Sequence, residues 1–244
     1  MKKQALYKDL AKYYDLIYSW KDYKKEVEII EKVISKYKKS RGKELLEVAC
    51  GSGHHIEYFK KNFSCTGIDI NQGILNVAKT KFKNITFKKA DMINFKLNKK
   101  FDVITCLFSS IGYVKTYPNL RKTIHNFARH LKTNGLVIIE PWFTKNTFKS
   151  GFKHMTTYED DKIAIARLNV SKVKGTISIL DMHYLVAEKF KDVKHFIDHH
   201  EMGLFEIDKT LQFMKEAGLK ARFLKNGLMK DRGLYVGVKQ KLFK

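Results

Sequence analysis

Residues 45–53 read LLEVACGSG, an apolar run that leads directly into a turn with two glycines. Such an apolar run is typical of a buried strand. Gly51 and Gly53 lack a Cβ atom, so the backbone there can bend tightly and approach a ligand. Helical spacing of apolar residues returns over 54–63. The stretch therefore predicts a strand, a glycine turn and a helix, with a ligand site at the carboxyl edge of a sheet.

The same alternation of strands and helices continues along the chain. This spacing implies right-handed crossovers and a parallel sheet that is covered on both faces. The predicted fold class is therefore α/β, with a doubly wound Rossmann-like sheet. Beyond the first unit, we expect helices at 21–38, 72–82, 118–131 and 207–217, and strands at 65–70, 85–87, 101–108, 136–140, 219–224 and 233–239.

A different pattern occupies residues 153–201. Short runs of alternating, β-branched residues are typical of antiparallel strands. We interpret this region as a small antiparallel β insertion that covers the substrate site. The main domain then consists of residues 1–152 and 202–244, and residues 1–40 are expected to form a helical lid over it.

The composition is that of a globular protein. Hydrophobic residues make up 44% of the 244 residues, which is enough to build a core. No apolar run reaches the roughly 18 residues of a membrane span, and the amino terminus lacks the apolar stretch of a signal peptide. We therefore expect a cytoplasmic protein with no membrane partner. The three cysteines are widely spaced and odd in number, so they predict neither a disulfide framework nor a metal pair.

The formal net charge of +23 attracts polyanions such as nucleic acid or phosphorylated metabolites. Of the 48 basic residues only six are arginine, although phosphate and base recognition favours the forked guanidinium group. A nucleic-acid partner is therefore open, but it is less favoured than a solvated, lysine-rich surface.

Acidic residues follow the next two strands in register with the glycine turn. Asp69 lies 18 residues beyond Gly51 at the end of the second strand, where a carboxylate can accept both hydrogen bonds of a ribose diol. Asp91 and Met92 follow the third strand, where they could bind and cover an adenine. Ile56 stands where a dinucleotide fingerprint needs a third small residue, so a nicotinamide cofactor is the weaker reading.

The strings LLEVACGSG, GIDI, KADM and FDVITCLFSS resemble the class I methyltransferases that use S-adenosylmethionine. The resemblance implies a seven-stranded sheet whose last strand is antiparallel, and S-adenosylhomocysteine as the product. It places Gly51 and Gly53 at the amino-acid end of the cofactor, Asp69 at the ribose, and Asp91 and Met92 at the adenine. The full set of expected cofactor contacts is Ala49, Gly51, Ser52, Gly53, Asp69, Ile70, Asp91, Met92 and Leu107.

A narrower resemblance lies outside the cofactor motifs. The strings CLFSSIGYVKT, IIEPWFTKNTF, LDMHYLV and RGLYVGV are similar to the dTDP-3-amino-3,6-dideoxyhexose N,N-dimethyltransferases of the desosamine and mycaminose type. This resemblance implies that the acceptor is the amino group of a nucleotide-linked deoxyamino sugar. It also implies a homodimer.

Methyl transfer from a sulfonium to an amine is an in-line displacement, so the site must align the reacting atoms and keep the nitrogen lone pair free. A strong general base or a metal is not required. The adjacent His54 and His55 do not share a helix face, and we assign no metal. The catalytic candidates are Tyr14, Tyr113 and His183; the candidate substrate contacts are Tyr18, Ser109, Ser110, Trp142, His200 and Arg232.

Three alternatives stay open. Another small amine could be the acceptor, because exchange of loops over this fold changes the substrate. An RNA-binding or RNA-modifying methyltransferase would use the basic surface and predicts steeply salt-dependent binding of RNA. A nicotinamide oxidoreductase would use the same glycine turn and predicts binding of NAD.

Overall fold

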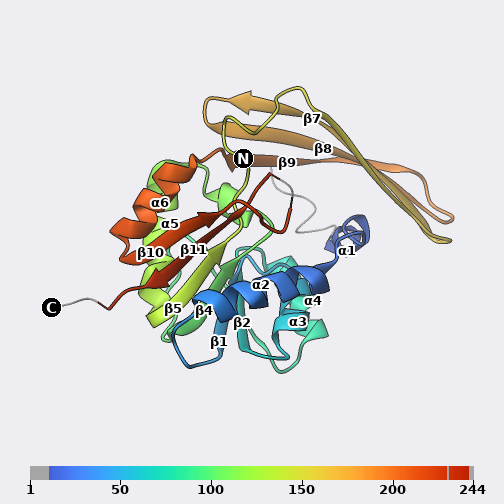
Figure 1. Ribbon diagram of the computed structural model, residues 1–244. Helices are drawn as coiled ribbons and strands as arrows, with labels where there is room; N and C mark the ends of the chain where they lie inside the picture. Colours follow the sequence, from blue (N-terminus) through green and yellow to red (C-terminus); the bar gives the residue numbers. More distant parts are fainter. Residues whose placement is uncertain (1–10, 230, 242–244) are drawn as a thin grey trace.

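The computed structural model describes residues 11–229 and 231–241, and it contains two sheets (Figure 1). The larger sheet has seven strands in the order β10-β11-β5-β4-β1-β2-β3. Its strands are β1 (Glu44–Val48), β2 (Ser64–Asp69), β3 (Thr86–Lys89), β4 (Phe101–Cys106), β5 (Leu131–Ile139), β10 (Leu219–Leu224) and β11 (Leu234–Lys239). The helices are α1 (Ala11–Ile17), α2 (Tyr23–Tyr37), α3 (His54–Phe59), α4 (Gln72–Lys81), α5 (Tyr117–His130) and α6 (Ile207–Glu216), with a 3₁₀ helix η1 (Ser110–Val114).

The pairing of the strands confirms the predicted α/β sheet. β1 pairs in parallel with β2 and β4, and β4 pairs in parallel with β5. β11 is antiparallel to both β5 and β10, so the last strand is antiparallel as expected. This order changes direction between β1 and β4, and ligands of open α/β sheets bind at such a point outside the carboxyl ends of the strands.

Neighbouring residues of β1 build the two halves of the core. Leu45 points into one cluster with α2 and α3, where Ile30 and Phe59 pack against it. Leu46 points to the opposite face and packs in a second cluster with α5 and α6, which contribute Phe127 and Met214. All six side chains are fully buried. A strand that is apolar on both faces is what a doubly covered parallel sheet requires.

Two local features differ from the expectation. β5 begins at Leu131 rather than near 136, because α5 ends one residue earlier and the chain pairs at once with Phe101. The segment after β4, expected to be a loop, forms η1. Phe108 and Ser109 before it both have left-handed backbone angles, with φ of 51° and 57°, which turn the chain sharply at the sheet edge.

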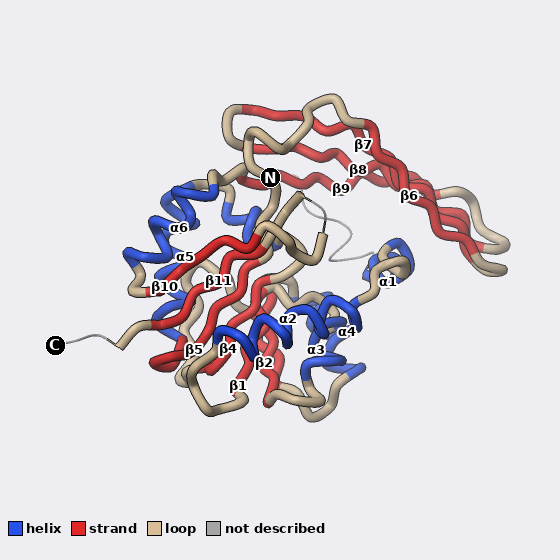
Figure 2. The backbone as a smooth tube through the Cα atoms, in the orientation of Figure 1, coloured by secondary structure: helices blue, strands red, loops and turns tan. Residues whose placement is uncertain are grey.

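The second sheet has four antiparallel strands in the order β6-β7-β8-β9 and forms a separate layer (Figures 1 and 2). Where the sequence suggested only short runs, β8 is one long strand that continues through Asp181, which pairs in register with His199. η1 packs against β9, and α1 packs against β6. The four strands are β6 (Lys153–Glu159), β7 (Ile163–Lys174), β8 (Ile177–Glu188) and β9 (Lys194–Gly203).

None of the helices in the described ranges is long and apolar enough to cross a membrane.

Candidate active site

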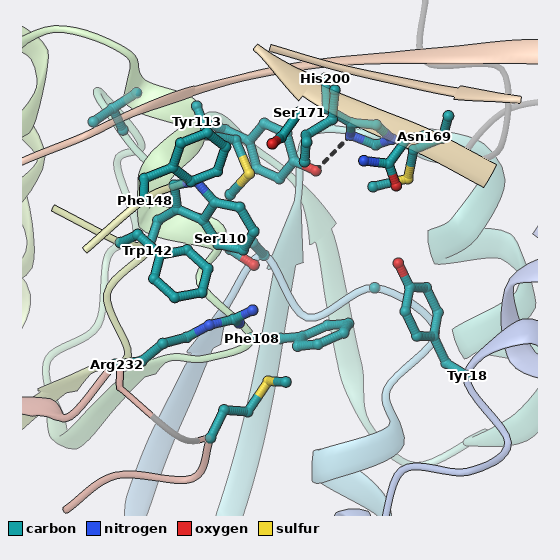
Figure 3. Close-up of a pocket in the computed structure, with 18 of the residues that line it drawn as sticks. Tyr18, Phe108, Ser110, Tyr113, Trp142, Phe148, Asn169, Ser171, His200 and Arg232 are labelled. Carbon is teal, nitrogen blue, oxygen red and sulfur yellow. Dashed lines mark hydrogen bonds between the residues drawn. The ribbon is translucent and has the colours of Figure 1, made fainter. Parts of the chain in front are cut away.

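A cavity of about 610 Å³ lies between the carboxyl edge of the central sheet and the inner face of the second sheet (Figure 3). Its walls come from the turns after β1, β2, β3 and β4, from β7, β8 and β9, and from the segment before β11. Tyr18 and Trp20, which follow α1, also line it. Residues that are far apart in the sequence therefore meet in one concave space.

The glycine turn forms the floor of one half of the cavity. Ala49 and Gly51 line it, and both have left-handed backbone angles, with φ of 56° and 55°. The Gly51 N–H donates a hydrogen bond to Asp69 Oδ2 at 3.0 Å, which ties the turn to the end of β2. Gly53 is also left-handed, with φ of 85°, and a Cβ there would in addition lie 2.9 Å from the Phe82 ring.

Polar and apolar groups alternate along the same half of the cavity. Asp69 Oδ1 accepts the Asn71 N–H at 2.9 Å, and burial raises the pKa of the carboxyl group. Each carboxylate oxygen has a second lone pair, so both can still accept a hydroxyl. Ile70 is 62% exposed here, and Asp91 and Met92 lie beside it. A carboxylate next to apolar side chains fits a ribose diol and a flat base, as an adenosine group presents them.

Three of the predicted cofactor contacts lie behind the cavity wall. Ser52 is buried, and its hydroxyl donates to Asp15 Oδ1 at 3.0 Å. Leu107 is buried in the core cluster under α2. Neither these two nor Gly53 lines the cavity, so the structure makes them supports of the turn.

The two adjacent histidines have separate partners. His54 Nε2 lies 2.7 Å from Asp15 Oδ1, whereas His55 lies between Glu26 and Glu47 at 2.9 and 3.1 Å. Burial by itself would lower the pKa of His55, but the hydrogen bonds to the two carboxylates outweigh it and raise the pKa to about 9. Within residues 11–229 and 231–241, no three His, Cys, Asp or Glu side chains are placed to hold a metal ion.

A hydrogen-bonded chain closes the other half of the cavity. The Tyr113 hydroxyl lies 2.8 Å from His200 Nδ1 (Figure 3). On the other side of the ring, His200 Nε2 lies 2.8 Å from Asp198 Oδ2. Asp198 is fully buried, and His200 is 3% exposed. These hydrogen bonds connect a buried carboxylate, through an imidazole, to a hydroxyl at the cavity wall, so the three groups together are able to move a proton.

Three inward residues of β7 were missed by the sequence analysis. Arg167 donates to the Tyr18 hydroxyl at 2.8 Å and to Thr156 Oγ1 at 3.0 Å. Asn169 and Ser171 follow at alternate positions and also line the cavity. The only signal was their spacing of two, which places all three on one face of a strand. Without the packing of the layers, the sequence did not indicate which face pointed inward.

The remaining acceptor-side candidates gather around Arg232. Its guanidinium lies 4.6 Å from the centroid of the Trp142 ring, and its Nη1 donates to Ser109 Oγ at 2.9 Å. Ser109 is buried behind the cavity wall and donates to the Pro141 carbonyl at 2.6 Å, so it holds the turn rather than facing the cavity. Ser110, Trp142 and Arg232 line the cavity.

One of the catalytic candidates lies outside the cavity. His183 lies on the exposed face of β8, with its Nδ1 3.2 Å from His195 Nε2. Strand alternation explains the error, because the inward position is taken by the neighbouring Tyr184, which is fully buried. Tyr14 lies on α1, and its side chain is outside what the structure describes.

The chain matches known methyltransferases along nearly its whole length. A family model described as "Methyltransferase domain" matches residues 45–135. The dTDP-3-amino-3,4,6-trideoxy-alpha-D-glucopyranose N,N-dimethyltransferase of Streptomyces venezuelae is 35% identical, over 94% of this chain and 98% of that relative. The dTDP-4-amino-2,3,4,6-tetradeoxy-D-glucose N,N-dimethyltransferase of Saccharopolyspora spinosa is 31% identical, over 95% of this chain and 93% of that relative.

Solved structures extend the match to three dimensions. The crystal structure of Streptomyces venezuelae DesVI has a TM-score of 0.89 at 34% identity and covers 94% of this chain and 98% of its own. The sugar N-methyltransferase KedS8 from Streptoalloteichus has a TM-score of 0.87 at 30% identity, over 93% of both chains. With this coverage, the similarity includes the second sheet as well as the central one.

Proposed function

The chain belongs to the S-adenosylmethionine-dependent methyltransferases, in the family of the dTDP-amino-sugar N,N-dimethyltransferases, and from this premise we propose that it methylates the amino group of a nucleotide-linked deoxyamino sugar. The observation that carries the proposal is the shape of the cavity, in which a carboxylate-lined half and a cationic, aromatic half are continuous. A cofactor and an anionic, hydroxylated acceptor fit there side by side.

The residues of the first half fit S-adenosylmethionine. Asp69 would accept the two ribose hydroxyls, and Ile70 and Met92 would cover the adenine while Asp91 lies at its edge. The backbone of Gly51 would lie against the amino-acid end. When bound, the cofactor supplies the electrophilic methyl group. Ile56 is fully buried in the core beneath the turn, which leaves no third glycine for a dinucleotide pyrophosphate and disfavours NAD.

The residues of the second half would orient the acceptor. An amine reacts only when it is neutral, so a proton must leave it before the displacement. We infer that the Tyr113 hydroxyl would accept that proton and pass it through His200 toward Asp198, and the hydrogen bonds that join these three groups support the inference. Tyr18 would border the amine from the opposite side, and the walls between them would exclude water and keep the reacting atoms aligned.

The cationic groups of the cavity suit the pyrophosphate of a nucleotide sugar. Arg167, Asn169 and Ser171 present a guanidinium, an amide and a hydroxyl along one strand. Arg232 offers a second guanidinium beside Trp142, whose ring could stack on a base or sugar face. Charge-assisted hydrogen bonds of this kind are the strongest available to a phosphate.

A methyl-transfer assay tests the proposal. Labelled S-adenosylmethionine would be offered with dTDP-3-amino- and dTDP-4-amino-deoxysugars, and in parallel with simple amines and total RNA. We expect a mass gain in the amino sugars, and mass spectrometry would count the methyl groups. Label in simple amines alone would move the acceptor to another small amine. Label in RNA alone, with binding that falls steeply as salt rises, would overturn the proposal and make the basic surface the substrate site.

We also propose that the chain forms a homodimer through the outer face of the second sheet. Large apolar side chains lie exposed there, and a patch of this kind marks an association surface. The same face carries both signs of charge, in Lys172 of β7 and Glu201 of β9, which allows it to be complementary to its own copy. Light scattering would give twice the chain mass, and a monomer would overturn this part. The apolar residues are Met155, Leu168, Val170, Leu185 and Ile197, which are 43–65% exposed.

A further inference from the structure

Glu140 follows β5 at the carboxyl edge of the central sheet and is fully buried. Its Oε2 accepts the Phe108 N–H at 2.6 Å, and its own N–H donates to the Cys106 carbonyl at 2.9 Å. Its other oxygen, Oε1, has no hydrogen-bond partner in the part of the chain that the structure describes. Burial of a carboxylate with one oxygen unsatisfied is unfavourable, so this position calls for a physical reason.

One reason is the turn that Glu140 holds. Phe108 and Ser109 are both left-handed, which is unfavourable for residues other than glycine. Glu140 fixes Phe108 by accepting the hydrogen bond of the Phe108 N–H. Ser109 is fixed from both sides, by the Pro141 carbonyl and by Arg232. The turn places Phe108 in the cavity, where its ring lies edge-on to the ring of Tyr18 at 5.1 Å.

A second reason is charge. Arg232, from the segment before β11, lies against the same turn, because its Nη1 donates to Ser109 Oγ, which donates to the carbonyl of Pro141 next to Glu140. Lys21 from the connection between α1 and α2 and Glu26 from α2 also act on the charge of Glu140. Burial raises the pKa of Glu140, and Arg232 and Lys21 oppose that rise while Glu26 adds to it. Burial likewise lowers the pKa of Arg232, which Glu140 opposes. Each of the two groups therefore stabilises the charge of the other.

We propose that Glu140 is a positioning residue that holds the Phe108–Ser109 turn and is the counter-charge of Arg232, so that binding of a pyrophosphate at Arg232 is coupled to uptake of a proton from solvent by Glu140. This inference rests on the proposed function, because it takes the pyrophosphate of a nucleotide-linked sugar as the ligand of Arg232. A bound anion neutralises the guanidinium and adds negative charge near Glu140, which favours the protonated carboxyl. By linkage, the anion then binds more tightly as the pH falls.

The test uses thymidine diphosphate glucose as the probe. It has no amino group, and its pyrophosphate lacks the monoester ionisation near a pH of about 6, so the probe itself does not titrate between about pH 5 and 8. Calorimetry in buffers of different ionisation enthalpy would count the protons taken up on binding. We expect uptake by the wild-type protein and a dissociation constant that rises with pH.

The variant Glu140→Gln separates the charge from the turn. Glutamine keeps an oxygen that can accept the Phe108 N–H but carries no charge. We expect no proton uptake, a pH-independent dissociation constant, and binding about tenfold tighter than wild type at the alkaline end. Glu28→Gln, which removes an exposed carboxylate of α2, is the matched control. It should show the same proton uptake and the same pH dependence of the dissociation constant as the wild type.

The variant Glu140→Leu removes both the charge and the acceptor for Phe108. We expect it to lower kcat with the amino sugar more than Glu140→Gln does, because only leucine releases the turn. The role of the charge is judged from proton uptake, which a merely structural role would not change. If the leucine variant does not fold, the glutamine variant still decides the matter. Proton uptake that is unchanged in Glu140→Gln, or failure of the wild type to bind the probe, overturns the inference.

The two proposals fail in different ways. Probe binding with coupled proton uptake, but no methylation of any amino sugar, would overturn the function and leave the coupling. If the protein methylates an amino sugar but Glu140→Gln takes up as many protons on binding the probe as the wild type does, only the coupling would be overturned.

Discussion

The two sheets of the molecule have opposite characters. The central sheet is apolar on both faces and covered by helices, and Leu45 and Leu46 of one strand are both fully buried. The second sheet buries polar groups such as Arg167 and His200 on its inner face beside an apolar cluster around Tyr184, and it exposes apolar side chains such as Leu168 on its outer face. The first arrangement supplies stability and a rigid cofactor turn. The second holds buried polar groups at the cavity through hydrogen bonds to the protein, of Arg167 to Tyr18 and of His200 to Tyr113 and Asp198.

The largest expected difference between the sheets is in stability. Leu45→Ala removes a fully buried side chain between β1 and α2, and the free energy of unfolding should fall by about 3 kcal/mol. Leu168→Ala removes a side chain that is 43% exposed, and the fall should be below about 1 kcal/mol when the protein is monomeric. Chemical denaturation measures both. Equal losses at low protein concentration would contradict the contrast between the two sheets.

The next effect concerns the cofactor half of the cavity. Asp69→Ala removes the acceptor for a ribose diol and also the bond that holds the Gly51 N–H, so affinity for S-adenosylhomocysteine should fall about 100-fold. Calorimetry measures it without any acceptor. Asp192→Ala, in the exposed turn between β8 and β9, is the control and should bind like the wild type. A small loss at Asp69 would refute its assignment to the ribose.

The sequence predicted the central sheet and the cofactor turn better than the acceptor half. Gly51 and Asp69 are set by a local rule, because a strand that ends in a glycine turn fixes where the next carboxylate lies. Arg167 depends on a non-local fact, namely which face of β7 packs over the cavity. The alternation of β8 was visible, yet it did not tell His183 from Tyr184 as the inward residue. Register within a sheet is local, whereas the packing of one layer on another is not.

A third change tests whether the inward face of the second sheet binds the acceptor. Arg167→Ala should lower kcat/KM for the amino sugar about 30-fold, because a charge-assisted contact is lost, while affinity for S-adenosylhomocysteine stays constant. Lys172→Ala is the matched control, since Lys172 is a cation on the outer face of the same strand. Similar losses in both variants would mean that general electrostatics, and not the inward face, governs binding of the acceptor.

The smallest expected effect comes from the proton path of the second sheet. Tyr113→Phe keeps the ring and removes the hydroxyl that lies 2.8 Å from His200, so kcat should fall about tenfold with little change in KM. The effect is modest because a displacement by an amine needs its proton removed but does not need a strong base. Asp198→Asn leaves the shape of the buried site nearly unchanged and removes the charge that supports a protonated His200, so kcat should fall in the same direction.

The dependence of kcat on pH distinguishes this path from simple packing. If Tyr113, His200 and Asp198 act as one chain, the losses in the two variants should be greatest at low pH, where the amine arrives protonated, and should shrink as the pH rises and solvent removes the proton instead. The double variant should then lose no more than the worse single variant. A loss that is constant over pH and additive in the double variant would reduce the chain to packing, and the inner face of the second sheet would only hold the acceptor in place.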